Sequence, residues 1–275
     1  MLWLDQEGQG HEDARDTKVS HITTKREGGI AVVALNRPDR RNAMTLAMWR
    51  ELARVFDELG RSTEVRAIVL AGAGGNFSVG ADISEFDEVR ATSEQSAAYE
   101  VAVDACSDAI AAAPKPTIAV VSGYCLGGGC HLAMACDFRF ADRSAILGIP
   151  AARLSIVYGM SSTQRLLALV GLTQAKRILF TGERFDAEQA LRIGFVDAVA
   201  DDAAKAAQDF AGGLARNAPL SIAGAKLMLN ALVMGPGALD PVAAQAVIDR
   251  ASDSEDYREG RRAFAEKREP AFKGR

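Results

Sequence analysis

The sequence predicts an α/β fold whose strands pair mainly in parallel. Short apolar runs rich in β-branched residues, such as residues 67–70 and 117–121, alternate with longer segments that have the apolar period of a helix. The second run leads into the glycine triplet 127–129 and then into a further helix-like stretch. Strands that alternate with helices are typical of a parallel sheet with helical crossovers.

The composition is that of an ordinary globular chain. It has 275 residues, of which 48% are hydrophobic and 25% charged, and its net charge of −4 gives no reason to expect nucleic acid as a partner. No apolar run approaches the ~20 residues of a membrane span. The N-terminus lacks the basic and apolar regions of a signal peptide, so a cytoplasmic protein is expected. Residues 1–17 are polar and aperiodic, which predicts a disordered lead.

The four cysteines contain no C-x-x-C pair, and three of them lie in the apolar central stretch. Buried, reduced thiols are therefore expected rather than disulfides, and no metal site is predicted. A reactive role for Cys130, which lies next to the glycine triplet, is an alternative.

The first half of the chain predicts strands and helices in alternation. Strands are expected at 19–24 and 30–35, joined by a turn at 27–29 that contains two glycines. Thr45 can cap a helix that runs to about residue 59. The strand 67–70 follows, then a helix at 93–113 that ends before two prolines, and then the strand 117–121.

The second half predicts a few short strands and then helices only. The expected strands are 138–141, 145–147 and 195–199, and the expected helices are 161–169, 173–180 and 187–193. From Ala203 onward the pattern is helical, with breaks near Pro219 and at 235–237. The predicted organisation is the lead 1–17, a core 18–200 and a helical C-terminal region 201–275.

Two strand–turn segments are candidates for one binding site. A glycine turn at the start of a helix points unpaired N–H groups outward, where they can hold a phosphate or a developing oxyanion. A second such segment, NFSVGADI at 76–83, follows the strand 67–70. Each segment can supply one N–H group to a single oxygen. For the glycine triplet by itself, a tight connection without a ligand is the alternative.

Five segments resemble the crotonase superfamily, whose best-known members are enoyl-CoA hydratases and isomerases. They are LNRPDRRNAM (35–44), FSVGADI (77–83), GYCLGGGC (123–130), LAMACDFRFA (132–141) and TQRL (163–166), and the resemblance covers roughly residues 18–275. It implies a spiral of ββα units with a helical C-terminal trimerisation region. It also implies an acyl-CoA thioester as substrate, with coenzyme A as part of that substrate and no permanently bound cofactor. The expected assembly is a homotrimer or a dimer of trimers.

The resemblance assigns site residues. The backbone N–H groups of Ala81 and Gly128 match the oxyanion hole, which stabilises the enolate of the thioester. The adenine of coenzyme A is expected against the backbone of residues 80–83. The residues expected to contact the acyl-CoA are Arg37, Arg40, Gly80, Asp82, Ile83, Gly127 and Lys273, with Arg41 as a further candidate for a phosphate. The arginines are candidates for the phosphates because cations without a buried partner suit an anionic ligand.

Two positions depart from the hydratase pattern. The residue after GGGC is a glutamate in hydratases and is His131 here, and the second glutamate position is Ala151. Hydration needs a base and an acid, so standard hydratase activity is doubtful. His131 at a helix start is the candidate base, since its cationic form is disfavoured there. Tyr158 is a second catalytic candidate, with simple packing as its alternative. Ser155, Ser161 and Ser162 are interpreted as loop or cap residues.

Three functions remain open at this point. The first is an enzyme of the enoyl-CoA hydratase/isomerase type in which His131 moves a proton. The second is an acyl-CoA-binding protein without catalysis. The third is a thioester hydrolase that uses His131 to activate water.

Overall fold

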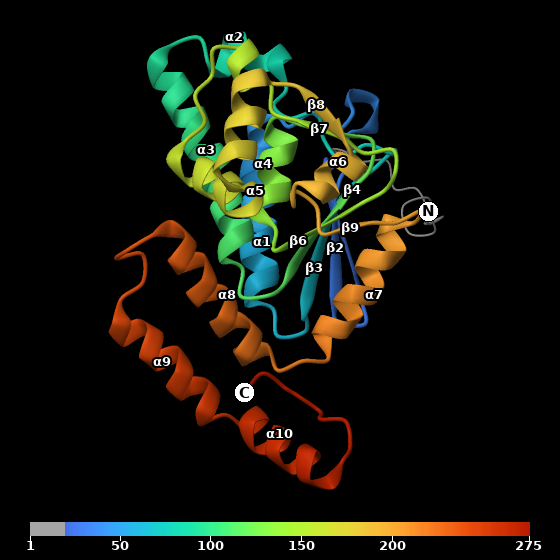
Figure 1. The fold of residues 1–275 in the computed structure, drawn as a ribbon, viewed down its shortest axis with the longest axis vertical. Coiled ribbons are helices and arrows are strands. Elements are labelled where there is room, and N and C mark those ends of the chain that lie inside the picture. The colour runs from blue at the N-terminus through green and yellow to red at the C-terminus, as the bar shows by residue number, and fades with distance from the viewer. Residues whose placement is uncertain (1–19) are drawn as a thin grey trace, which may run out of the picture.

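A computed structural model describes residues 20–275, so the predicted lead at 1–17 lies outside the described residues. The main sheet has six strands in the order β1-β2-β3-β4-β6-β9, and every pair except β1–β2 is parallel (Figure 1). This confirms the predicted α/β class. The strands are β1 (Ile22–Glu27), β2 (Ile30–Leu35), β3 (Ala67–Gly72), β4 (Thr117–Val121), β6 (Phe138–Ala141) and β9 (Ala198–Val199).

A second sheet has three strands and lies at the end of the molecule that contains the predicted site. It consists of β5 (Tyr124–Leu126), β7 (Ile146–Gly148) and β8 (Arg184–Asp186), with β5 parallel and β8 antiparallel to β7. The sequence predicted neither β5 nor β8. Each is three residues long, too short for a period-2 pattern to be recognised, and their pairing depends on strands from elsewhere in the chain.

The main sheet is packed on both faces, because alternate strand residues point to opposite sides. On one face Ile68, Leu70 and Ala119 belong to the large core under α1, α3 and α4. On the other face Val69 and Val120 pack against α7. The covering helices are α1 (Leu46–Arg61), α3 (Ser93–Ala112), α4 (Gly128–Ala135), α5 (Met160–Thr181) and α7 (Ala203–Ala215).

Local signals explain how the main helices begin and break. The Thr45 side chain accepts a hydrogen bond from the Met48 amide, as the cap prediction requires. The helix α5 contains a non-helical residue, Gly171, at φ 71°, which separates the two helices predicted at 161–169 and 173–180. Five short elements complete the core: η1 (Pro38–Arg40), η2 (Ile83–Glu85), α2 (Phe86–Val89), η3 (Ala151–Arg153) and α6 (Ala187–Arg192).

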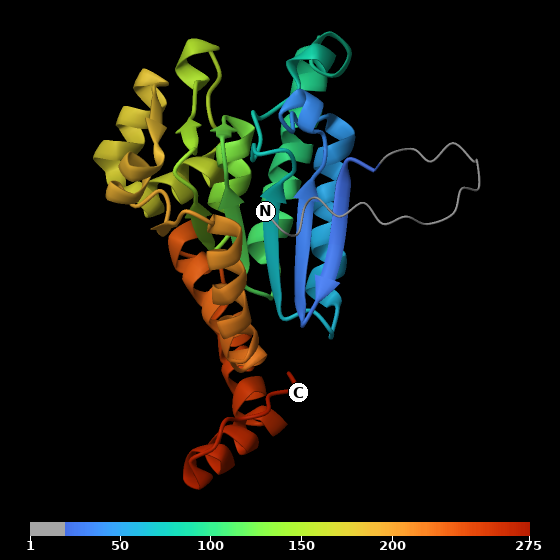
Figure 2. The ribbon, with the colours of Figure 1, turned by 90° about the vertical axis from the view of Figure 1, so that its right-hand side faces the viewer.

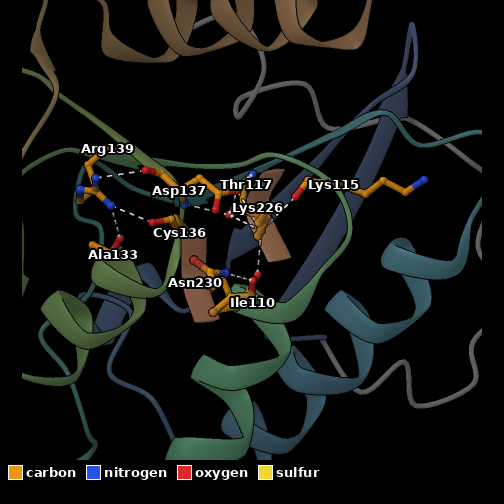
Figure 3. Close-up of polar contacts among 10 residues, drawn as sticks. Ile110, Lys115, Thr117, Ala133, Cys136, Asp137, Arg139, Lys226 and Asn230 are labelled. Carbon is orange, nitrogen blue, oxygen red and sulfur yellow. Dashed lines mark hydrogen bonds and ion pairs between the residues drawn. The ribbon is translucent and has the colours of Figure 1, made fainter. Parts of the chain in front are cut away.

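The last three helices extend away from the layered core (Figures 1 and 2). They are α8 (Pro219–Met234), α9 (Pro241–Ser252) and α10 (Glu255–Glu266), which confirms the predicted helical C-terminal segment and its breaks. The helix α8 is anchored to the core by a buried polar cluster. Its Lys226 amine lies 2.8 Å from the Asp137 carboxylate and 3.0 Å from the Lys115 carbonyl oxygen (Figure 3).

Two predicted strands have a boundary that differs from the structure by three residues. The strand expected at 195–199 is reduced to Ala198–Val199, because Phe195 leaves a tight turn at Gly194 and is buried edge-on against Phe185. The first strand begins at Ile22, later than predicted, and extends to the Gly28-Gly29 turn, where β2 fixes its register.

Candidate active site

The strand β5 brings the two predicted turns together. The Ser78 amide donates to the Tyr124 carbonyl oxygen (2.9 Å), and the Leu126 amide donates to the Ser78 carbonyl oxygen (2.9 Å). On the other side, Met44 bonds to the residues flanking Ala81, since its amide donates to Gly80 and its carbonyl accepts from Asp82. The N–H group of Ala81 itself therefore faces away from Met44.

The amides of Ala81 and Gly128 lie at the contact between these segments. A Cβ added to Gly128 would lie 3.3 Å from the Ala81 nitrogen, and one added to Gly80 would lie 2.8 Å from the Gly128 nitrogen. Gly128 is the first residue of α4, so its N–H has no acceptor within the helix. No backbone acceptor for Ala81 is found within residues 20–275. Two backbone amides without an acceptor among the described residues thus lie near each other, and an oxyanion hole needs two such donors.

The backbone before α4 requires glycine. Gly127 has φ 51° and ψ −111°, a combination that residues with a Cβ rarely adopt. Its amide donates to Gly148 of β7 (2.8 Å) and its carbonyl accepts from His131 (3.1 Å), so this turn is fixed at both ends. The Gly128 donor is therefore held in place before any ligand binds.

A buried aromatic pair lies beside Gly128. The Trp49 indole nitrogen donates to the Tyr99 hydroxyl at 3.0 Å, and a Cβ on Gly128 would meet the same indole at 3.1 Å. Burial raises the pKa of the Tyr99 phenol to about 12. The sequence gave no sign of this contact between Trp49 and Tyr99.

His131 lies one helical turn after Gly128, so the two residues share a face of α4. Its side chain is buried, with 6% of its surface exposed. Burial lowers the pKa of His131 to about 4, and the positive charge of Arg165 adds to this effect while Asp108 opposes it. The imidazole is therefore neutral at neutral pH, as predicted, but the cause is burial and not the helix start.

Ser162 is the polar neighbour of His131, and the interpretation of this serine as a loop or cap residue was wrong. It lies inside α5, buried, with its hydroxyl oxygen 3.3 Å from both ring nitrogens of His131. Equal distances mean that the hydroxyl favours neither nitrogen. The contact links α4 and α5, which are distant in sequence, so the serine spacing alone could not reveal it.

Arg165, one turn after Ser162, supplies the charge near His131. It is buried and donates to Ser107 (2.9 Å) and to the Asp108 carboxylate (2.7 Å) of α3. Arg165 belongs to the TQRL segment, which the resemblance singled out without giving its arginine a role. The pair with Asp108 fixes the guanidinium beside the imidazole.

Tyr158 and His131 lie near each other, with ring centroids 6.2 Å apart. Burial raises the pKa of the Tyr158 phenol, so the hydroxyl stays protonated and can act only as a donor or neutral acceptor. Within residues 20–275 the hydroxyl has no hydrogen-bond partner. The structure thus brings both catalytic candidates together.

Arg37 is not the unpartnered cation that the sequence analysis assumed. Its guanidinium contacts the Asp82 carboxylate at 2.5 Å and the Ala43 carbonyl oxygen at 3.1 Å. Burial alone would raise the pKa of Asp82, but hydrogen bonds from Ser84 and Arg37 outweigh it and lower that pKa to about 2. This buried pair holds the 80–83 segment to the loop before α1.

The other predicted contact residues are divided between two places. Arg40 and Arg41 are exposed near the site, where Arg41 lies over the Tyr124 ring at 5.2 Å. Ile83 is 72% exposed at the start of η2. Lys273 follows Phe272, whose carbonyl accepts from Arg66 before β3. Because Ala81 comes after the other end of β3, the Lys273 of the same chain is not brought to the site.

The cysteines are free and buried, as predicted. Burial raises the pKa of Cys125, Cys106 and Cys136. The Cys130 thiol donates to the Cys125 carbonyl oxygen at 2.9 Å. Within residues 20–275, no group of side chains is arranged to hold a metal ion and no helix is long and apolar enough to cross a bilayer.

Comparisons with known proteins give the family of the chain. Residues 25–275 match the model of the enoyl-CoA hydratase/isomerase family. A short-chain-enoyl-CoA hydratase of Clostridium acetobutylicum is 34% identical over 265 residues, covering 94% of this chain and 100% of the relative. The structure of an enoyl-CoA hydratase/carnithine racemase from Magnetospirillum magneticum superposes with a TM-score of 0.87 at 36% identity, covering 93% of this chain and 96% of the other. The structure of an enoyl-CoA hydratase from Bacillus anthracis superposes with a TM-score of 0.83 at 30% identity, covering 93% of this chain and 100% of the other.

Proposed function

Since the chain belongs to the enoyl-CoA hydratase/isomerase family, we propose that it binds an acyl-CoA thioester and moves a proton at the carbon next to the thioester carbonyl. The observation that carries this proposal is the neutral, buried imidazole of His131 one turn from the free Gly128 amide. The proposal combines that base with the two donors at Ala81 and Gly128.

The paired amides would stabilise the charge that develops when the proton leaves. Removing a proton next to the carbonyl turns the thioester oxygen into an enolate oxygen, which accepts more strongly than the ground-state carbonyl. Loss of one such donor typically costs about 3 kcal/mol of transition-state stabilisation. The positive end of α4 adds to the same effect at Gly128.

His131 would be about as strong a base as a carboxylate, but it would carry a different charge before and after it takes the proton. Its pKa of about 4 is close to the ~4.3 of an ordinary glutamate. A carboxylate becomes neutral when it takes the proton, whereas the imidazole becomes a cation beside the enolate. One base that takes a proton from one carbon and returns it to another supports isomerisation of a double bond better than hydration, which also needs a bound water and an acid.

The remaining predicted residues fit supporting roles. Tyr158, with an unpartnered hydroxyl near His131, is proposed to donate a hydrogen bond to the substrate. Arg40 and Arg41 are proposed to contact the coenzyme A phosphates, and the 80–83 backbone, held by Arg37 and Asp82, to receive the adenine.

A homotrimer or a dimer of trimers is proposed for the assembly. The projecting helices α8 and α9 expose large apolar side chains, among them Leu229 (63% exposed), Leu232 (78%) and Val242 (76%). Light scattering coupled to size exclusion would test this proposal, and a monomeric mass at micromolar concentration would contradict it.

The function is tested by deuterium exchange from D₂O into a panel of saturated and unsaturated acyl-CoAs, followed by mass spectrometry. Wild-type protein should exchange the proton next to the carbonyl, and His131→Ala should lose exchange while it still binds. His21→Ala is the matched control, because His21 lies at the start of β1, outside the site. Binding without exchange would favour the non-catalytic acyl-CoA-binding protein, and release of free thiol would favour the hydrolase.

A further inference from the structure

A pocket lies at the opposite end of the main-sheet strands from the proposed site at His131. Its walls are the Arg66 side chain before β3, the 114–116 loop before β4, and the corner between α7 and α8. These walls meet at the N-terminal ends of the parallel strands, whereas Ala81 and Gly128 follow their C-terminal ends. The lining residues are Arg66, Pro114, Lys115, Pro116, Leu214, Ala215, Asn217, Pro219 and Ile222.

The charges in this pocket have one sign. Arg66 and Lys115 both line it, and none of the lining residues is an aspartate or a glutamate. Burial lowers the pKa of Lys115, and the nearby charge of Arg66 lowers it further. Within residues 20–275 no acceptor for the Lys115 amine is found, although its carbonyl oxygen is bound by Lys226. Figure 3 shows the Lys115 side chain extending away from the Lys226 cluster.

The backbone adds further donors on the same side. The 16-residue helix α8 begins at Pro219, and its N-cap residue Ala218 provides no side-chain cap. The amides of the first turn therefore point outward at the positive end of the helix dipole. Asn217, just before the helix, can provide a side-chain amide. The side chains that line the pocket and the backbone amides at the start of α8 thus all favour a bound anion over water.

The pocket is fixed in shape by the buried polar cluster of α8. The Lys226 amine bonds to the Lys115 carbonyl oxygen (3.0 Å) and to Asp137 (2.8 Å), which joins the 114–116 loop to α8. On the Arg66 side, one guanidinium nitrogen donates to the Phe272 carbonyl oxygen at 2.9 Å. Since both cationic side chains start from anchored backbone, a bound anion would not need to order the pocket itself.

We propose that this Arg66–Lys115 pocket binds a small oxyanion of the phosphate class, either as the free ion or as the end of a phosphate monoester. Arg66 offers the guanidinium N–H groups that do not bond to Phe272, and Lys115 offers its ammonium group; two such cationic donors suit a tetrahedral oxyanion. The anion would remove the repulsion between the two cations and would join the 114–116 loop to the start of α8. The proposal is independent of the acyl-CoA chemistry at His131.

The test is calorimetric titration of the full chain with inorganic phosphate and, separately, with glycerol phosphate, at constant ionic strength. Wild-type protein should bind saturably, Lys115→Gln should bind roughly tenfold or more weakly, and Lys115→Arg should bind as wild type does. Lys176→Gln, an exposed lysine of α5, is the matched control and should change nothing. Binding of glycerol phosphate but not of the free ion would assign the monoester as the source.

Two results would overturn the proposal. One is the absence of saturable binding of either phosphate compound to wild-type protein. The other is equal affinity in wild type and Lys115→Gln. Thermal unfolding of Lys115→Gln, with and without an acyl-CoA, shows that this variant is folded, and unchanged acyl-CoA binding separates loss of the anion pocket from damage at the His131 site.

Discussion

The Trp49 indole nitrogen donates a 3.0 Å hydrogen bond to the Tyr99 hydroxyl in the buried core, while the far edge of the same indole lies against Gly128. Tyr99 is in turn covered by Arg90, whose guanidinium carbon lies 4.9 Å from the ring centroid. One hydrogen bond between α1 and α3 thus sets the position of the ring that lies beside a proposed oxyanion donor. It makes Trp49 a positioning residue for Gly128.

Trp49→Phe should slow deuterium exchange into acyl-CoA by roughly tenfold. The smaller ring no longer supports Gly128, and the Tyr99 hydroxyl loses its buried donor, which costs about 1–3 kcal/mol of stability. Tyr99→Phe is the matched variant, because it removes the same hydrogen bond and leaves the indole ring in place. If both variants slow exchange equally, the hydrogen bond matters and the ring volume does not; unchanged exchange in both would contradict the positioning role.

Gly80→Ala should abolish exchange, and Gly75→Ala should not. Both glycines have positive φ (91° and 75°), so an alanine is strained at either position. At Gly80 the new Cβ would lie 2.7 Å from the Leu126 carbonyl oxygen and 2.8 Å from the Gly128 nitrogen. A Cβ added at Gly75 would have no heavy atom within 4 Å. The measurements are exchange rate and unfolding midpoint, and equal loss of activity in the two variants would contradict a role specific to Gly80.

The stability of the protein should fall with acidification because His131 must become charged in its buried site. The folded-state pKa of about 4 lies below the ordinary 6.5, so the unfolded chain binds more protons between these two values. The stability that depends on a neutral His131 is fully present above pH 6.5 and is lost as the pH falls through about 4. The free energy of unfolding falls by about 3 kcal/mol over this range. Urea unfolding of wild type and His131→Gln at several pH values between about 4 and 6.5 measures this loss, because the variant lacks the imidazole. The same dependence of unfolding free energy on pH in both proteins would refute the prediction.

Lys226→Met should destabilise the attachment of α8 by about 3 kcal/mol, the lower end of the cost of breaking a buried ion pair. Among residues 20–275, the variant leaves the Asp137 carboxylate with Thr117 alone as a partner. The carboxylate lies 2.8 Å from the Thr117 amide and 2.9 Å from the Thr117 hydroxyl (Figure 3). Asn230→Ala, which removes a single 3.0 Å bond to Ala111, is the control and should cost about 1 kcal/mol. Equal unfolding midpoints for the two variants would show that the ion pair does not hold α8.

The sequence by itself determined the elements whose signals are local. The strands 30–35, 117–121 and 138–141 were predicted at the bounds of β2, β4 and β6, because continuous apolar, β-branched runs flanked by turn residues identify buried strands. The cap at Thr45 and the breaks before α8 and α9 follow from single residues with fixed backbone preferences. The family, and with it the proposed donors at Ala81 and Gly128, came from motif order along the chain.

The tertiary structure decided everything that depends on contacts between distant segments. The strand β5 brings Ala81 to Gly128, α5 brings Ser162 and Arg165 to His131, and Asp82 takes up the charge of Arg37. Arg66 and Lys115 are 49 positions apart in the sequence and form one pocket only because β3 and β4 are neighbours in the sheet. Burial, which makes His131 neutral, is likewise a property of the packed core and not of the residues next to it in the chain.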